Sequence, residues 1–403
     1  MKYLLKILGK GSLWCIVILI VYLNIRLYYK PSYVTVDSKS INQDVLRQLN
    51  YLKLQFSEGL GEKMQERYPE GFVFVHALYG LAWAELIKGL PSQNTLYQDG
   101  LKEVEFAQKA LFSAYALNNF PTNLGPGYGI FHAGWSNYLL AKQLMAMPEE
   151  DRDSSLLVEF KTKSDKIAKA FEEDSSPYLE SYRGLAWPAD NMVAMASLAL
   201  HDQLLEPRYD SLKQDWLRNV KELLDPKTGL IPHEVEPQTG KLMEGAKGSS
   251  QSLMNSFLID IDSTFAVEQF NQYKTLFLDY RFGLPGIREY PKGTKGKMDI
   301  DSGPILLQIG GSASVVGLRT MATYGATKEA VGLRNSIEAF GVGYNSNQKK
   351  QYLFGLEPMA DAFIVWAGSL DIENEEKQLG NWRWSFQLLS ILIILFCSAL
   401  IWW

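Results

Sequence analysis

The chain contains repeated apolar stretches with helical spacing. Each of them begins just after a loop rich in glycine or proline. At every start, polar and aromatic residues precede or enter the first turn of a stretch with helical hydrophobic spacing. The six starts are residues 70–76, 128–132, 187–191, 248–251, 299–304 and 356–361. They lie roughly 53 to 61 residues apart, and a near-constant period is typical of a repeat architecture. Each period is long enough for two helices and two loops.

Six helical hairpins are the number that closes an α/α toroid, with one helix of each hairpin inside and the other outside. The pattern therefore predicts an all-α fold, an (α/α)6 toroid, in which the inner-helix starts converge on one central cavity. Turn residues on either side of a β-like stretch at 229–243 predict a small β-hairpin insertion over one mouth of the toroid. A long glycine-containing loop is expected over 282–297.

Two continuous apolar runs lie near the two ends of the chain. The first, 13–23, follows three lysines and has no small-residue cleavage site after it, which favours an uncleaved anchor over a signal peptide. The second, 386–403, has aromatic residues at both ends, as expected at two membrane interfaces. Either run could instead be a buried core helix. We expect an N-terminal membrane anchor (1–30), a toroid domain (31–381) and a C-terminal transmembrane helix (382–403).

The sequence gives weaker signals for the side of the membrane on which the toroid lies. Positive charges flank the first run on both sides, so counting them does not decide the orientation. An N-terminal anchor led by lysines usually stays inside, so we expect the toroid to be extracytoplasmic, in the periplasm.

The amino-acid composition indicates which classes of binding partner the protein is expected to have. The 403 residues are 47% hydrophobic and 21% charged, with a net charge of −5, which is typical of a folded protein with a large core. No basic stripe stands out, so nucleic acid is not an expected partner. Cys15 and Cys397 both lie in the apolar runs, so the globular part has no disulfide and no thiol nucleophile. A metal held by Asp299, Asp301 and a histidine is conceivable, but HExxH-like spacing is absent, and we expect neither metal nor cofactor.

Acidic, imidazole and amide side chains occupy the predicted inner-helix starts. Any one of them could simply cap backbone N–H groups. Several of them directed at one cavity would instead indicate proton transfer or the binding of a polar ligand. The sharpest local pattern is Trp187-Pro-Ala-Asp190-Asn191, which places a flat ring beside a carboxylate, a common way to hold a sugar next to an acid. Asp299 and Asp301 stand two residues apart at another helix entry, where burial would raise one of the two pKa values.

These considerations give a set of candidate site residues. Asp190, Asp301 and His132 are predicted to be catalytic, although His132 could equally be a core histidine whose hydrogen bonds are satisfied. His233 and Glu234 in the hairpin are candidates to close over a ligand, or are solvated loop residues. The predicted substrate-binding residues lie at the inner-helix starts and in the glycine-rich loop: Tyr128, Trp135, Trp187, Asn191, Gln251, Arg288, Glu289, Tyr290, Asp299, Glu357 and Asp361.

Six hairpins with acidic and aromatic residues at the inner-helix starts resemble the six-hairpin glycosidase superfamily. This resemblance implies that Asp190 and Asp301 act as acid and base on a glycosidic bond, and inversion would require them to be about 6.5 to 9.5 Å apart. The toroid is also similar to the linalool dehydratase-isomerase family, which implies acid/base dehydration of a small allylic alcohol; the chain lacks cavity cysteines, unlike that enzyme. Residues 187–191, 245–252, 284–291 and 299–304 resemble segments of uncharacterised bacterial membrane-anchored proteins.

The leading hypothesis is a membrane-anchored, extracytoplasmic toroid that acts on a carbohydrate or glycan by carboxylate acid/base catalysis. One alternative is a non-catalytic protein that binds glycans or assists envelope assembly. Another is a lyase or isomerase of terpene-like or lipid-like alcohols. Replacing Asp190 and Asp301 would separate the first two, because an enzyme would lose its rate whereas a binding protein would lose only affinity.

Overall fold

Six helices form a closed inner ring in the computed structural model, which describes residues 2–300, 302–346, 348–372 and 381–402. Each inner helix packs against the next, and the last packs against the first, which closes the ring. The inner helices are α4 (Gly71–Ile87), α7 (Gly129–Ala146), α9 (Pro188–Leu204), α11 (Gly248–Ile261), α13 (Gly311–Thr323) and α15 (Pro358–Gly368).

A second set of helices packs on the outside of this ring, one against each inner helix. They are α2 (Gln43–Ser57), α5 (Thr95–Leu111), α8 (Ser154–Glu173), α10 (Asp210–Glu222), α12 (Ser263–Phe277) and α14 (Thr327–Phe340). The short helices α3 (Leu60–Arg67) and α6 (Ala114–Leu117) lie in connections. The predicted (α/α)6 toroid is confirmed by this pattern of contacts.

Burial explains why the two sets of helices differ in sequence. Fifteen residues of α4 are buried, on all sides of the helix, because neighbours surround it. The outer helix α10 buries only Trp216, Leu217 and Val220 and exposes its charged residues. The sequence of an inner helix is therefore apolar on all sides, whereas the sequence of an outer helix is amphipathic.

Five of the six predicted inner-helix starts coincide with observed starts. The exception is the start predicted at 299–304, which is wrong, because α13 begins at Gly311. A hairpin of β7 (Ile305–Leu306) and β8 (Ile309–Gly310) lies between the two positions. Leu307 and Gln308 turn this hairpin with left-handed backbone angles.

The toroid carries more small antiparallel hairpins than the single one that the sequence predicted. The expected hairpin is present as β3 (Glu234–Val235) and β4 (Leu242–Glu244). The expected long loop at 282–297 is partly wrong, because its first residues form the turn and second strand of a hairpin of β5 (Leu278–Arg281) and β6 (Leu284–Ile287). Two more hairpins are β1 (Tyr33–Val36) with β2 (Lys39–Asn42), and β9 (Tyr344–Ser346) with β10 (Lys349–Gln351).

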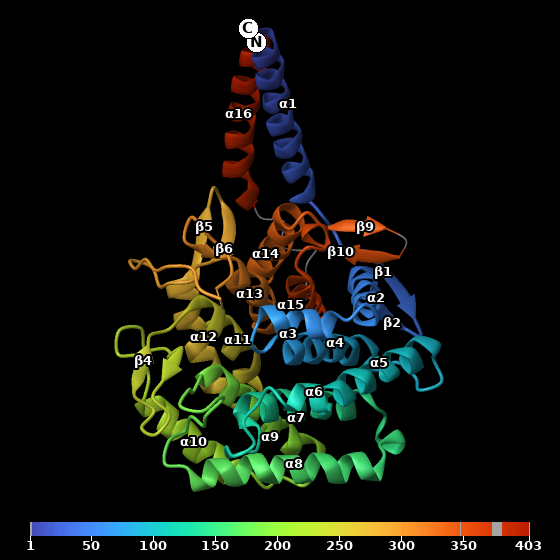
Figure 1. Cartoon of the computed structure of the whole chain (residues 1–403), viewed down its shortest axis with the longest axis vertical. Coiled ribbons are helices and arrows are strands. Elements are labelled where there is room, and N and C mark those ends of the chain that lie inside the picture. The colour runs from blue at the N-terminus through green and yellow to red at the C-terminus, as the bar shows by residue number, and fades with distance from the viewer. Residues whose placement is uncertain (1, 301, 347, 373–380, 403) are drawn as a thin grey trace.

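Two apolar helices project side by side from the toroid, so that both chain termini lie at the same end of the molecule (Figure 1). These are α1 (Lys2–Arg26) and α16 (Trp384–Trp402). Both are long and apolar enough to cross a membrane. In the same view, α5 and α8 run across the picture while α1 and α16 run along it.

Aromatic side chains from alternate inner helices meet across the axis of the ring. Trp135 of α7, Phe257 of α11 and Trp366 of α15 have ring centroids 5.5 to 6.4 Å apart, and all three are buried. We call these three residues the aromatic plug. The plug fills the middle of the ring and divides its interior into two parts, and the convergence of the inner-helix starts on one cavity stays a prediction. The interior has an N-terminal mouth, where the inner helices begin, and a C-terminal mouth, where they end.

Candidate functional site

An acidic corner lies where α9 begins at the N-terminal mouth. Asp190, in the first turn of α9, accepts a 2.6 Å hydrogen bond from the hydroxyl of Ser181. Burial and then the charges of Glu70 and Asp190 raise the pKa of the neighbouring Tyr182. The ring of Trp187 packs edge-on against Tyr182, at 6.0 Å. Tyr182 thus neighbours both Trp187 and Asp190, and the predicted placement of the Trp187 ring beside the carboxylate stays a prediction.

Two other predicted residues at the helix starts hold neighbouring loops. Asn191 is fully buried, and its amide accepts from the backbone N–H of Leu179 and donates to the carbonyl of the same residue, at 2.8 and 3.1 Å. Gln251 donates a 2.6 Å hydrogen bond to the carbonyl of Ile231. Their side chains position these loops at the mouth, and their contact with a ligand stays a prediction.

His132 lies among aromatic rings in the wall of the ring. Its Nε2 is 2.8 Å from the carbonyl of Leu111, and burial lowers its pKa, so the imidazole is neutral at pH 7. Tyr128, whose backbone is left-handed, places its ring 5.8 Å from His132. Trp135 belongs to the aromatic plug. The setting of His132 is that of a core histidine, and its role as acid or base stays a prediction.

The start of α15 contributes two more predicted acids. Asp361 is fully buried and accepts a 2.9 Å hydrogen bond from the backbone N–H of Tyr352. Burial raises its pKa well above the ordinary range of a carboxyl group. Glu357 lies 3.5 Å from Arg67 in a partly exposed ion pair. These contacts join α15 to neighbouring segments.

A lysine at the start of α11 brings two acidic residues together. Lys247 is 4% exposed, and its Nζ lies 2.8 Å from the carboxylate of Glu244 and 2.7 Å from that of Asp299. Burial acts to raise the pKa of Asp299, but hydrogen bonds from Lys247 and from the backbone N–H of Ser302 outweigh it and hold the pKa below its usual value. Asp299 is therefore ionised at neutral pH.

Glu289 lies beside this group, and its pKa is shifted in the opposite direction to that of Asp299. It is fully buried, and its Oε1 accepts a 2.6 Å hydrogen bond from the hydroxyl of Ser249. Its Oε2 has no hydrogen-bond partner among the described residues. Burial, followed by the charge of Asp299, raises the pKa of Glu289 to about 7. Two neighbouring carboxyl groups thus have pKa values shifted in opposite directions, the pattern that separates an acid from a base in active sites.

The glycine-rich loop and the hairpin frame this cluster. Arg288 fixes the loop through a 3.0 Å hydrogen bond to the carbonyl of Tyr290 and a 3.0 Å ion pair with Asp279. His233 contacts the hydroxyl of Ser250, and its pKa falls to about 3 because of burial and the charge of Lys247. The hairpin therefore supplies a neutral imidazole beside the lysine.

The structure brings together only some of the predicted residues. Glu289 and Asp299 meet around Lys247, whereas Asp190 lies on α9, the neighbouring inner helix. Asp301 lies outside the described residues, so the predicted pairing of Asp190 with Asp301 stays a prediction. Sequence reasoning missed Lys247 and Ser249, because a single lysine or serine before a helix is common and marks a site only once its partners are known.

In the part of the chain that the structure describes, the side chains form no ready-made metal site. Within those residues, no group of three or more histidine, cysteine, aspartate or glutamate side chains is arranged to hold a metal ion.

Comparisons with known proteins find similar solved structures at low sequence identity. No protein-family model and no curated protein matches the chain. Among solved structures, a GH76 α-mannanase of Bacteroides thetaiotaomicron is similar, with 10% identity, a TM-score of 0.45, and coverage of 79% of this chain and 87% of that one. An unsaturated glucuronyl hydrolase of Bacillus sp. GL1, responsible for the degradation of glycosaminoglycan, is also 10% identical with a TM-score of 0.45. That alignment covers 93% of this chain and 98% of the hydrolase. The toroid assigned here rests on the helix contacts described above.

Proposed function

We propose that the protein is a membrane-anchored, extracytoplasmic toroid that acts on a carbohydrate by carboxylate acid/base catalysis at its N-terminal mouth. The observation that carries the proposal is the neighbouring pair of Glu289 and Asp299, whose pKa values are shifted apart around Lys247. In this assignment Glu289 is the general acid and Asp299 the general base. The pair Asp190 and Asp301 is the alternative assignment of the same two roles.

The proposed chemistry follows from the protonation states. Below about pH 7, Glu289 holds a proton that it can donate to the oxygen of a glycosidic bond as the bond breaks. Asp299 is ionised and can accept a proton from the attacking water, while Lys247 stabilises its charge. The rings of Trp187 and Tyr182 at the same mouth offer flat apolar faces of the kind that sugar rings stack on.

The test measures the release of reducing ends from a panel of glycans by the full chain in detergent. We expect Glu289→Gln and Asp299→Asn each to lower kcat by about 100-fold or more, as for the loss of a general acid or base. The exposed Glu150→Gln variant is the control and should leave kcat unchanged. The rate should also fall above about pH 7 in the unsubstituted protein, because Glu289 loses its proton there.

Three outcomes distinguish the alternatives. If Asp190→Asn abolishes turnover while Glu289→Gln retains it with its decline above pH 7, the Asp190 and Asp301 assignment replaces the one proposed here. If glycans bind without turnover, the protein is the non-catalytic binder. If no glycan binds to the folded chain, the carbohydrate proposal fails.

A further inference from the structure

A pocket of about 300 Å³ opens at the C-terminal mouth of the ring, on the far side of the aromatic plug from the site described above. The ends of α4, α7, α11 and α13 line it, together with the residues that follow α15. Its charged and phenolic lining consists of Glu85, Tyr138, Lys142, Asp260, Arg319 and Asp371. A cavity of this size is at the small end of ligand sites and suits one small molecule.

Several lining groups have hydrogen-bonding capacity left over. Asp260 accepts one hydrogen bond, at 2.9 Å from the hydroxyl of Tyr138. Lys142 and Arg319 approach the carboxylate of Glu85 only to 4.0 and 3.9 Å, which is too long for a hydrogen bond. Among the described residues, these carboxylates therefore face a cavity with acceptor positions open, which is how a polar ligand site is arranged.

The charge balance of the pocket favours a cation. Three carboxyl groups face the cations of Lys142 and Arg319, and helix carboxyl ends add partial negative charge. Lys39 lies nearby, but its Nζ donates to the backbone carbonyls of residues 85, 86 and 88, at 2.6 to 3.2 Å, and so caps the end of α4. Burial raises the pKa values of Asp260 and Asp371, although nearby cations act in the opposite direction. Burial also acts to raise the pKa of Glu85, but the positive charges of Lys142, Arg319, Lys88 and Lys39 outweigh it and lower that pKa.

The type of cation follows from the geometry. The described residues offer no cluster of three acidic or histidine ligands for a metal ion. An organic ammonium group places three N–H donors in different directions and suits carboxylates that are spread around a cavity. Lys142 is a donor with no hydrogen-bond acceptor among the described residues, and it would need an oxygen on the ligand.

We propose that this pocket binds a small primary amine that also carries hydroxyl groups, with its ammonium group between Asp260 and Glu85 and a hydroxyl oxygen accepting from Lys142. The site is separated from the Glu289 cluster by the aromatic plug, and it stands whether or not the proposed function holds. Amino sugars and amino alcohols share this chemistry.

Isothermal titration calorimetry on the full chain in detergent tests the proposal. The probes are glucosamine and ethanolamine, and the controls are glucose and N-acetylglucosamine, which keep the ring but lack the ammonium charge. We expect one or both amines to bind and the two controls to bind at least about tenfold more weakly, a difference of about 1.4 kcal/mol. Binding by glucosamine alone would indicate an amino sugar, and binding by ethanolamine alone a smaller amino alcohol.

Substitutions locate the binding. Asp260→Asn should weaken amine binding at least about tenfold, whereas Asp215→Asn, in an exposed ion pair on the outer helix α10, should leave it unchanged. Thermal unfolding of each variant confirms that it is folded; should Asp260→Asn fail to fold, Glu85→Gln replaces it with the same expectation. The proposal is overturned if neither amine binds to the folded chain, if N-acetylglucosamine binds as well as glucosamine, or if the folded variant keeps full affinity.

Discussion

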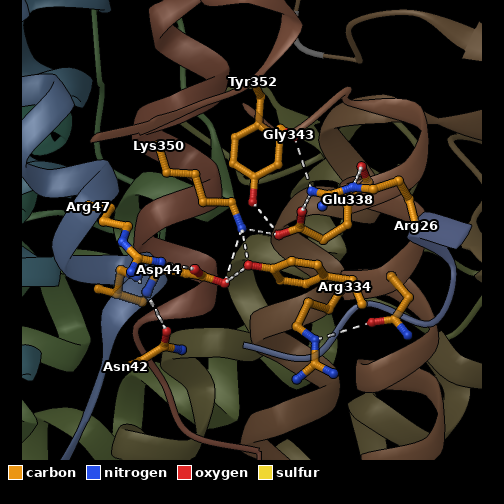
Figure 2. A network of polar contacts seen from close by, with 12 residues as sticks. Arg26, Asn42, Asp44, Arg47, Arg334, Glu338, Gly343, Lys350 and Tyr352 are labelled. Atoms are coloured by element: carbon orange, nitrogen blue, oxygen red, sulfur yellow. Dashed lines mark hydrogen bonds and ion pairs between the residues drawn. The ribbon is translucent and has the colours of Figure 1, made fainter. Parts of the chain in front are cut away.

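At the scale of single residues, Lys350 is the most buried lysine or arginine among the described residues (Figure 2). Its side chain is fully buried, and its Nζ is paired with Glu338 of α14 and, at 3.1 Å, with Asp44 of α2. The hydroxyl of Tyr29 donates to Asp44 at 2.6 Å, and that of Tyr352 donates to Glu338 at 2.8 Å. The network compensates one buried cation with two carboxylates and their phenolic donors.

Removing the cation should therefore be costly. We expect Lys350→Met to lower the free energy of unfolding by about 3 to 5 kcal/mol, because Asp44 and Glu338 would lose the buried cation between them and keep only the more exposed arginines Arg47 and Arg26. Denaturant unfolding of the full chain in detergent, followed by tryptophan fluorescence, measures the effect. The control is Lys169→Met, which breaks only an exposed pair with Glu173 and should change stability by less than about 1 kcal/mol. Equal effects of the two substitutions would show that the Lys350 network adds nothing.

This residue also shows what the sequence could not reveal. Lys350 and Asp44 are 306 positions apart, and a lone lysine normally indicates a solvent-exposed site. Lys247 likewise pairs with Asp299, which is 52 positions away in the sequence. Both acids of the candidate site were predicted from local patterns, Glu289 from the glycine-rich loop and Asp299 from an expected helix start that is not there. Their cationic partner Lys247 was not predictable, because its pairing with Asp299 depends on the fold.

At the scale of elements, helix starts were predictable where the sequence has a residue typical of the first helical turn, such as proline. Pro188 and Pro358 occupy the first helical positions of α9 and α15, where a missing N–H costs nothing. The start of α13 was not predictable, since a hairpin of two residues per strand carries almost no periodic pattern. The two halves of the ring interior were also not predictable, because the aromatic plug depends on contacts between alternate helices.

The junction between β6 and α11 gives a prediction at this scale. A Cβ on Gly248 would lie 1.8 Å from the carbonyl oxygen of Arg288, so any side chain there forces the strand away from the helix. We expect Gly248→Ala to lower the free energy of unfolding by about 1 to 3 kcal/mol, as overpacking does. Thermal or denaturant unfolding provides the measurement. Gly368→Ala, where no atom lies within 4 Å, is the matched control, and a loss of stability as large as that of Gly248→Ala would refute the packing argument.

At the scale of the whole molecule, the two apolar helices are fixed to the toroid by their inner ends. Arg26, the last residue of α1, pairs with Glu338 and donates to the carbonyl of Gly343 at 3.1 Å. The carbonyl of the buried Leu27 accepts hydrogen bonds from Asn335 of α14, at 2.8 Å, and from Arg383 before α16, at 2.7 Å. These contacts therefore fix the two helices relative to the ring, with α14 next to α1.

The paired helices also make the membrane orientation testable. Because both termini lie at the end of the molecule away from the toroid, the toroid and the start of α1 should lie on opposite sides of a membrane (Figure 1). After Cys15 and Cys397 are replaced by serine, we would introduce single cysteines as Lys169→Cys in the toroid or Gly9→Cys in α1. A membrane-impermeant maleimide should label the first in intact cells and the second only after permeabilisation, because lysine-led anchors keep their amino end inside. The reverse pattern would place the toroid in the cytoplasm and exclude an extracytoplasmic glycan as its substrate, and labelling of both in intact cells would show that the helices do not cross the membrane.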